Sequence, residues 1–203
     1  MNEINIPACI PRTHSRFGQW LGTKVLNWFG WQVVGSFPEH SKFVAAVAPH
    51  TSNWDFIIAI AVKMHLQVRI RFLGKHSIFI WPLSILLRKW GGIAVDRRAA
   101  NGVVGQVKAL FDETDALILG LAPEGTRKHM PNWKTGFIHI ANAAQVPLVP
   151  MALDYSKKQF VIMPAIYVSD DIEQTLVQVQ QQFSTAMGKY PQQVSGAVRK
   201  TRY

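Results

Sequence analysis

The pair His50 and Asp55 has the residue types and the spacing that suit acid–base chemistry. The two residues lie five positions apart in APHTSNWDF, residues 48–56, directly after the apolar run KFVAAV. A neutral imidazole can remove a proton from a hydroxyl near physiological pH, and a carboxylate on its other nitrogen fixes the tautomer and stabilises the imidazolium that forms. The same stretch also fits a simple turn in which Asn53 or Asp55 caps a following helix. His50 is therefore a candidate general base whose role depends on what other segments bring beside it.

Two more polar segments carry groups that suit a phosphate. GGIAVDR, residues 91–97, places Asp96 and then Arg97 after a short apolar run. APEGTRK, residues 122–128, combines a residue that permits a tight turn, a hydroxyl and a forked cationic donor, in Gly125, Thr126 and Arg127. Each segment by itself also fits an ordinary polar connection between a strand and a helix. The three segments form a candidate site only if the fold brings them together.

The apolar runs that precede these segments predict the strands of one sheet. They lack the alternation of a half-exposed strand and are separated by helical patterns, which indicates a mostly parallel sheet with helices on both faces. The expected strands are KFVAAVAP, VRIRFLG, GGIAVD, ALILGLAP, VPLVPMALDY and QFVIMPAIYV, the last a candidate antiparallel strand. The expected helices cover residues 53–66, 81–90, 102–111, 135–144 and 170–187. Ligands bind at the carboxyl ends of such strands, so this α/β fold predicts that the three polar segments share one edge.

Residues 16–29 predict an amphipathic helix ahead of this sheet. Its apolar residues recur at spacings of three and four, at Phe17, Trp20, Leu21, Val25 and Trp28. Aromatic residues beside Arg16 and Lys24 are typical of helices that lie in a membrane interface, and packing on the domain's own core explains the pattern equally well. At the other end, residues 189–203 are polar and basic, and we expect this tail to be loosely ordered.

Composition limits the classes of protein that fit. The chain has 203 residues, 48% of them hydrophobic, which suits one well-packed domain. Its formal net charge of +10 attracts it to phosphates. Cys9 is the only cysteine, so neither an intrachain disulfide nor a cysteine-built zinc site is expected. No phosphate-binding loop, dinucleotide fingerprint or metalloprotease motif occurs. Neither a secretory signal nor an apolar stretch of transmembrane length is found, so we expect any membrane contact to be made from the surface.

Four segments, in the order in which they occur, resemble the motifs of the glycerolipid acyltransferases, the family typified by 1-acylglycerol-3-phosphate acyltransferase. They are HTSNWD, KHSIFIWPLSILLRKWGGIAVDR, PEGTR and VPLVPMAL, and together they span about residues 48–153. Each motif is short, but four in the family's order form a specific pattern. The resemblance implies that residues 1–203 form a single acyltransferase domain with the α/β fold of that family.

The resemblance also implies an activity, namely transfer of a fatty acyl group from an acyl-CoA or acyl-carrier-protein thioester to a hydroxyl of a lysolipid-like acceptor. His50 would deprotonate that hydroxyl and Asp55 would orient His50, with direct attack on the thioester and with neither a metal nor a cofactor. Glu124 would shape the phosphate site, and Pro150 would form part of the acyl-binding wall. The residues expected to hold the acceptor's phosphate are Lys75, Arg97, Gly125, Thr126 and Arg127.

The charge of the chain agrees with these implied partners. A net charge of +10 suits an anionic membrane surface and an acidic acyl carrier, so we expect a peripheral enzyme of phospholipid biosynthesis on the cytoplasmic, inner face of the cytoplasmic membrane, with no nucleic acid partner. The default acceptor is 1-acylglycerol-3-phosphate. Pro49, Ala122 and Lys128 depart from the family's usual residues, which leaves another lysolipid or an amino-acid lipid as alternatives. The alternative from a different class is a non-catalytic basic module that binds nucleic acid or anionic membrane.

Overall fold

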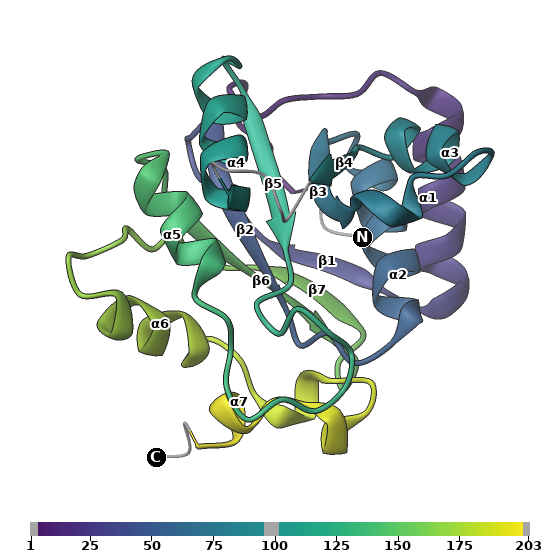
Figure 1. Ribbon diagram of the computed structural model, residues 1–203. Coiled ribbons are helices and arrows are strands. Elements are labelled where there is room, and N and C mark those ends of the chain that lie inside the picture. The colour runs from purple at the N-terminus through teal and green to yellow at the C-terminus, as the bar shows by residue number, and fades with distance from the viewer. Residues whose placement is uncertain (1–3, 96–101, 201–203) are drawn as a thin grey trace.

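Seven strands form one sheet in the part of the chain that this computed structural model describes, residues 4–95 and 102–200 (Figure 1). The strands are β1 (Gln32–Gly35), β2 (Lys42–Ala48), β3 (Ile70–Lys75), β4 (Gly92–Val95), β5 (Leu117–Leu121), β6 (Leu148–Asp154) and β7 (Gln159–Ile162). Their order across the sheet is β1-β7-β6-β2-β5-β3-β4, and every pair is parallel except β6 with β7. This confirms the expected α/β fold with a mostly parallel sheet.

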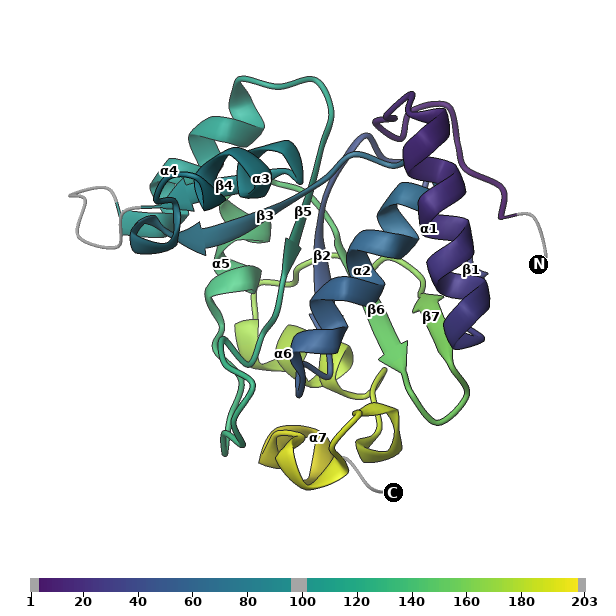
Figure 2. The ribbon, with the colours of Figure 1, turned by 90° about the vertical axis from the view of Figure 1, so that its right-hand side faces the viewer.

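Helices cover both faces of the sheet. They are α1 (Arg16–Phe29), α2 (Asn53–His65), α3 (Leu83–Lys89), α4 (Gly102–Asp112), α5 (Gly136–Ala143), α6 (Ile172–Gln180) and α7 (Gly196–Lys200), with short 3-10 turns η1 (His76–Ile78), η2 (Thr185–Met187) and η3 (Pro191–Gln193). Figures 1 and 2 place α1 and α2 on one face and α4, α5 and α6 on the other. No helix within the described ranges is long and apolar enough to cross a membrane.

The central strand β2 shows why the apolar runs lack alternation. Phe43 and Ala45 belong to the core beneath α1 and α2, whereas Val44 and Ala46 belong to the core beneath α4 and α5. Successive side chains of a strand point to opposite faces, so a strand that is buried on both faces reads as one continuous apolar run.

The α1 helix packs closely on α2 along one face and leaves another face uncovered. A Cβ atom at Gly22 would lie 2.5 Å from the carbonyl oxygen of Ala61, so only glycine permits this approach. Leu26 is fully buried in the same contact, but Phe17 and Trp28 are 71% and 87% exposed. Packing on the domain therefore explains Gly22 and Leu26, and it leaves the exposed aromatic side chains unexplained.

Several elements differ from those expected from the sequence. The edge strand β1 was not expected, because four residues with one buried side chain show no readable periodicity. The last long helix ends at Gln180, and η2 and η3 follow it. The expectation of a loosely ordered tail is wrong over residues 189–200, where Val194, Ser195 and Val198 are at most 3% exposed. These buried side chains are too widely spaced among polar residues to form a helical pattern.

Candidate active site

His50 and Asp55 contact each other just after the carboxyl end of β2. Nδ1 of His50 lies 3.0 Å from Oδ2 of Asp55, and the side chains are 22% and 1% exposed. The cap of α2 explains how this spacing brings them together. Ser52 is the N-cap, and its N–H donates to Oδ2 of Asp55 at 2.8 Å in a reciprocal capping box. Asp55 therefore caps the helix and also contacts the imidazole, so a helix cap and an acid–base pair are compatible in this stretch.

The carboxylate of Asp55 has partners on both oxygens. Oδ2 also accepts from the N–H of Thr51 at 2.8 Å, and Oδ1 accepts from the hydroxyl of Tyr155 at 2.7 Å. Burial, followed by the hydrogen bond to Asp55, raises the pKa of Tyr155, so its hydroxyl stays protonated and donates. The ring of Tyr155 packs edge-on against Trp31, with 4.9 Å between centroids. Because Nδ1 of His50 donates to this anchored carboxylate, Nε2 is the nitrogen left to take up a proton.

Glu124 joins the His50 loop to the loop that follows β5. Its side chain is 3% exposed, and Oε1 accepts from the backbone N–H of His50 at 3.0 Å. Burial raises the pKa of the Glu124 carboxyl, against the opposing effect of its backbone hydrogen bonds. Within the described residues, its second oxygen is buried without a hydrogen-bond partner. Glu124 thus holds the backbone of the candidate base in place from inside the protein.

The loop after β5 makes a tight turn beside the candidate base. Gly125 has a φ of +66°, in the left-handed region, and its N–H donates to the carbonyl of Ala122 at 3.0 Å. Thr126 is partly exposed and Arg127 is exposed. The side chain of Lys134 lies across the turn, since a Cβ atom at Gly125 would come within 3.3 Å of its Nζ. The loop therefore presents a hydroxyl, a guanidinium and an ammonium group at one place.

A cavity of about 740 Å³ lies between α2 and the sheet and connects these groups. Its polar part contains His50, Thr126 and Arg127. Most of the remaining lining is apolar and comes from α2 and the strands beneath it, including Phe56, Ile60, Phe72, Leu121, Met151 and Leu153. This arrangement can hold a molecule with a polar group at the imidazole and a long apolar chain beneath the helix.

Lys63 lines the same cavity about two helical turns beyond Phe56. Its Nζ donates to the carbonyl of Trp90. Burial, with a smaller contribution from the charge of Arg69, lowers the pKa of Lys63 to about 8. A partly buried ammonium group therefore stands in an otherwise apolar part of the cavity.

The segment that builds this site also carries the family relationship. Residues 32–154, from β1 to the end of β6, match the sequence model of the family described as acyltransferase. This chain belongs to the acyltransferase family. The matched segment contains His50, Asp55 and Glu124 together with the loop of Arg127.

Curated proteins with similar sequences are named 1-acyl-sn-glycerol-3-phosphate acyltransferase. The chain is 29% identical over 143 residues to the 1-acyl-sn-glycerol-3-phosphate acyltransferase of Haemophilus influenzae, an alignment that covers 66% of this chain and 58% of that protein. It is 30% identical over 135 residues to the 1-acyl-sn-glycerol-3-phosphate acyltransferase alpha of Mus musculus, covering 61% of this chain and 46% of that protein. The chain thus spans about half the length of the curated relatives that it matches.

A solved acyltransferase structure has a similar fold. The crystal structure of the 1-acyl-sn-glycerophosphate (LPA) acyltransferase PlsC from Thermotoga maritima superposes with a TM-score of 0.58, covering 92% of this chain and 79% of that chain. At 17% sequence identity, the likeness concerns the fold alone.

The residues expected at the acyltransferase site are not all placed together. Among the described residues of this set, those that line the cavity are His50, Asp55, Gly125, Thr126 and Arg127. Pro150 does not line it, and Met151 and Leu153 of the same strand line it instead. The physical reason is the strand period of two, which turns Pro150 toward the opposite face of the sheet. Arg97 lies outside the described residues, and of Lys75 only the backbone at the end of β3 is described.

Contacts from distant segments were missed by the sequence reasoning. When the amide of Gln193 is assigned the orientation that gives both its oxygen and its nitrogen suitable partners, the nitrogen donates to the carbonyls of Thr51 and Arg127, at 2.9 and 3.0 Å. The N–H of Tyr190 donates to Oγ1 of Thr51 at 3.2 Å. Tyr155 was signalled by its place at the end of the expected strand VPLVPMALDY, at the predicted ligand-binding edge. Gln193 lies in a polar segment that offers no such signal.

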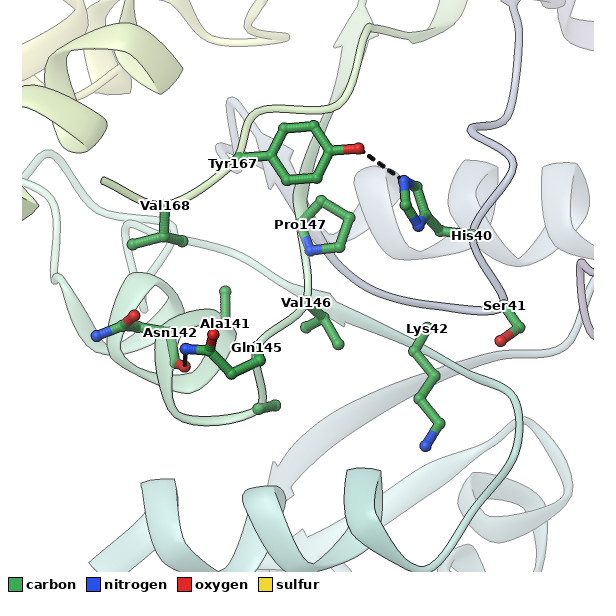
Figure 3. A pocket seen from close by; sticks show the side chains of 11 residues that line it. His40, Ser41, Lys42, Ala141, Asn142, Gln145, Val146, Pro147, Tyr167 and Val168 are labelled. Atoms are coloured by element: carbon green, nitrogen blue, oxygen red, sulfur yellow. Dashed lines mark hydrogen bonds between the residues drawn. The ribbon is translucent and has the colours of Figure 1, made fainter. Parts of the chain in front are cut away.

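A second cavity, of about 370 Å³, lies at the opposite edge of the sheet, where β2 and β6 begin (Figure 3). Its lining includes His40, whose Nε2 lies 2.8 Å from the hydroxyl of Tyr167, and Lys42, whose Nζ donates to the carbonyl of Phe111 at 2.7 Å. No Asp or Glu is among the described residues that line it, so it lacks the acid–base pair of the first cavity. In residues 4–95 and 102–200, no group of three or more His, Cys, Asp or Glu is placed to hold a metal ion.

Proposed function

We propose that this chain transfers a fatty acyl group from a thioester to the hydroxyl of a lysophospholipid-like acceptor, by default 1-acylglycerol-3-phosphate. The observation that carries the proposal is the His50–Asp55 pair at the polar part of a cavity whose remaining lining is mostly apolar. A general base beside such a cavity suits a substrate that joins a hydroxyl to a hydrocarbon chain. The similar proteins named 1-acyl-sn-glycerol-3-phosphate acyltransferase support the same acceptor.

In the proposed reaction, His50 moves one proton from the acceptor to the leaving group. Nε2 takes the proton of the hydroxyl as the oxygen attacks the carbonyl carbon of the thioester. The tetrahedral intermediate then collapses, the carbon–sulfur bond breaks, and the thiolate takes the proton from the imidazolium. Asp55 stabilises the imidazolium in between, and such general-base assistance contributes roughly 100- to 10,000-fold to the rate. The acyl group passes directly from sulfur to oxygen, without an acyl-enzyme, a metal ion or a cofactor.

The phosphate of the acceptor is proposed to bind at the loop after β5. Arg127 offers a forked donor that matches a phosphate, and Thr126 offers a hydroxyl beside it. Lys134, which lies across the same turn, adds a second positive charge. Lys75 and Arg97 are proposed to complete this site.

The proposed donor is an acyl-CoA or an acyl-carrier protein, whose acidic groups match the net charge of +10. The exposed aromatic face of α1 suits the headgroup region of a membrane, with Phe17, Trp20 and Trp28 at 71%, 55% and 87% exposure. We therefore place the enzyme as a peripheral protein on the inner, cytoplasmic face of the cytoplasmic membrane.

Lipid mass spectrometry tests the proposal. The full chain is incubated with mixed lysolipids and an isotope-labelled acyl thioester, and labelled product is expected from one lysolipid class. His50→Ala is expected to lower the rate by about 100-fold or more. His139→Ala is a matched control, because His139 is an exposed histidine of α5 on the other face of the sheet. Undiminished transfer by the His50→Ala variant would show the mechanism to be wrong, and vesicle or nucleic acid binding without any transfer would favour the non-catalytic module.

A further inference from the structure

A patch of apolar side chains is exposed around α3, in residues 78–86. Between 40% and 81% of each side chain is exposed for Ile78, Ile80, Trp81, Leu83, Ile85 and Leu86. Single exposed apolar residues are ordinary on a soluble domain, but a group of large ones is typical of a surface that binds a protein, a membrane or a ligand. We call these six residues the 78–86 patch.

The patch is held on the rigid sheet. Leu87 of α3 is buried, and the ring of Phe79 packs so closely on β3 and β4 that a Cβ atom at Gly74 or Gly92 would lie 2.7 or 3.0 Å from it. The guanidinium of Arg88 lies over the same ring, 5.7 Å from its centroid. The exposed side chains are therefore presented by an anchored element.

The chain segment that carries the patch has charges of one sign. Residues 56–95 contain six Lys or Arg and no Asp or Glu, and the two cations at the end of α3, Arg88 and Lys89, are exposed. Exposed apolar side chains next to exposed cations complement a surface that is anionic outside and apolar within, which describes an anionic bilayer. An acidic protein would match the cations but not six exposed apolar side chains.

The helix that carries part of the patch, α3, lies on the same side of the sheet as α1. Figures 1 and 2 both show α1, α2 and α3 on one side of the sheet. The exposed aromatic residues of α1, such as Trp20 and Trp28, and the part of the 78–86 patch that belongs to α3 are therefore carried by helices on the same side of the sheet.

The patch also continues into the cavity that holds His50. Ile78 belongs to the patch and to the lining of that cavity, and Leu87 lines the cavity from the buried side of α3. A lipid that leaves a bilayer beneath the patch could reach the cavity along apolar side chains without exposing its chain to water.

We propose that the 78–86 patch is a second membrane-contacting surface, which inserts into the headgroup and acyl boundary of an anionic phospholipid bilayer and delivers the lipid acceptor to the cavity. The delivery step rests on the proposed acyltransferase function, whereas bilayer binding does not. A second copy of the chain and an acyl-carrier protein are competing occupants of the same surface.

Vesicle sedimentation tests the binding step. The full chain and the Trp81→Glu/Ile85→Glu variant are mixed with vesicles of phosphatidylcholine and phosphatidylglycerol, and with phosphatidylcholine vesicles alone. The variant is expected to bind the anionic vesicles at least about tenfold more weakly. The control is Val177→Glu/Gln181→Glu, which places the same charge on an exposed position of α6 and on its exposed C-cap residue, across the sheet, and should bind like the wild type. Circular dichroism verifies that each variant is folded.

Two acceptors test the delivery step. A long-chain lysolipid is presented in vesicles, and a short-chain analogue is presented as a water-soluble monomer. The patch variant is expected to have a raised KM for the vesicle acceptor and unchanged kinetics for the soluble one.

Equal loss on both acceptors would overturn delivery, and equal sedimentation of variant and wild type would overturn the membrane surface. A wild-type dimer that the variant abolishes, or carrier-protein binding lost only in the variant, would assign the patch to another occupant. Vesicle binding through the patch with no acyl transfer by the wild type would instead refute the proposed function and leave the surface standing.

Discussion

Tyr155 donates its hydroxyl hydrogen to Oδ1 of Asp55 at 2.7 Å, while Oδ2 of the same carboxylate faces Nδ1 of His50 at 3.0 Å. The residue that orients the candidate base is thus oriented in turn by a residue 100 positions along the chain. Trp31 packs edge-on against the ring of Tyr155 and restricts its movement. We infer that Tyr155 is a positioning residue, which acts on the reaction through Asp55.

Tyr155→Phe tests this relationship. The ring and its contact with Trp31 remain, but Oδ1 of Asp55 loses its donor and the imidazole is held less firmly. We expect kcat to fall by about tenfold, the equivalent of one hydrogen bond to a charged group, with KM unchanged. Steady-state kinetics measure the split. Tyr167→Phe, at the opposite edge of the sheet, is the control, and a change confined to KM would contradict the positioning role.

Asp55→Asn separates the charge of Asp55 from its place in the helix cap. Asparagine retains a side-chain oxygen that accepts from the cap, so the free energy of unfolding should change little. It does not stabilise an imidazolium, so we expect kcat to fall by about 100- to 10,000-fold. Chemical denaturation and single-turnover kinetics report the two effects. The control is Asp171→Asn, which alters the cap of α6 in the same way and should leave the enzyme as active as the wild type. Equal activity of the Asp55 and Asp171 variants would refute the role of Asp55.

Arg127→Ala tests the phosphate site. Arg127 is exposed beside the cavity, so its loss should leave the fold intact. A hydrogen-bonded charge pair contributes about 1.5–3 kcal/mol, so we expect the KM for a phosphate-bearing acceptor to rise by roughly 10- to 100-fold. Lys128→Ala removes the neighbouring charge and serves as the control. An unaltered KM in the Arg127 variant would remove this residue from the phosphate site.

Gln193→Leu tests the contact between the C-terminal segment and the two candidate catalytic loops. The amide of Gln193 bridges the carbonyls of Thr51 and Arg127, and leucine offers neither donor. We expect the free energy of unfolding to fall by about 1–2 kcal/mol and kcat/KM to fall with it. Urea unfolding and kinetics measure the two. Gln182→Leu, at an exposed position after α6, is the control, and wild-type values for the Gln193 variant would show that the bridge contributes nothing.

The pKa of Lys63, about 8 against an ordinary value of 10.5, predicts a pH-dependent stability. Between these values the unfolded chain binds more protons at Lys63 than the folded chain, so its contribution to the free energy of unfolding rises with pH. Lys63→Met removes this dependence, and the stability of wild type relative to the variant should increase from pH 8 to pH 10.5. Because water still reaches part of the ammonium group, the change should be on the order of 1 kcal/mol. Urea unfolding at several pH values measures it, with the exposed Lys24→Met as the control, and parallel pH curves for wild type and the Lys63 variant would contradict it.

The fold could be predicted because its elements are locally encoded. Apolar runs that are buried on both faces and the helices between them were recognisable without any knowledge of contacts, and this was enough for a mostly parallel sheet. Edge strand β1 and the segment from η2 to α7 were missed, because four-residue strands and isolated buried valines lack a period. Pro150 was expected in the acyl-binding wall, although the strand period of two turns it away from the cavity.

The sequence by itself determined the order of the strands and helices from β2 to α6 and the polar residues at the strand ends, including His50, Asp55 and the loop of Arg127. Each of these depends on neighbours a few positions away. Only the tertiary structure decided which distant groups meet there, namely Glu124 at the backbone of His50, Tyr155 at the carboxylate of Asp55 and Gln193 between the loops. The reason is physical. These contacts depend on the order of the strands across the sheet and on how the C-terminal segment packs over its edge, and both are set by burial summed over the whole chain.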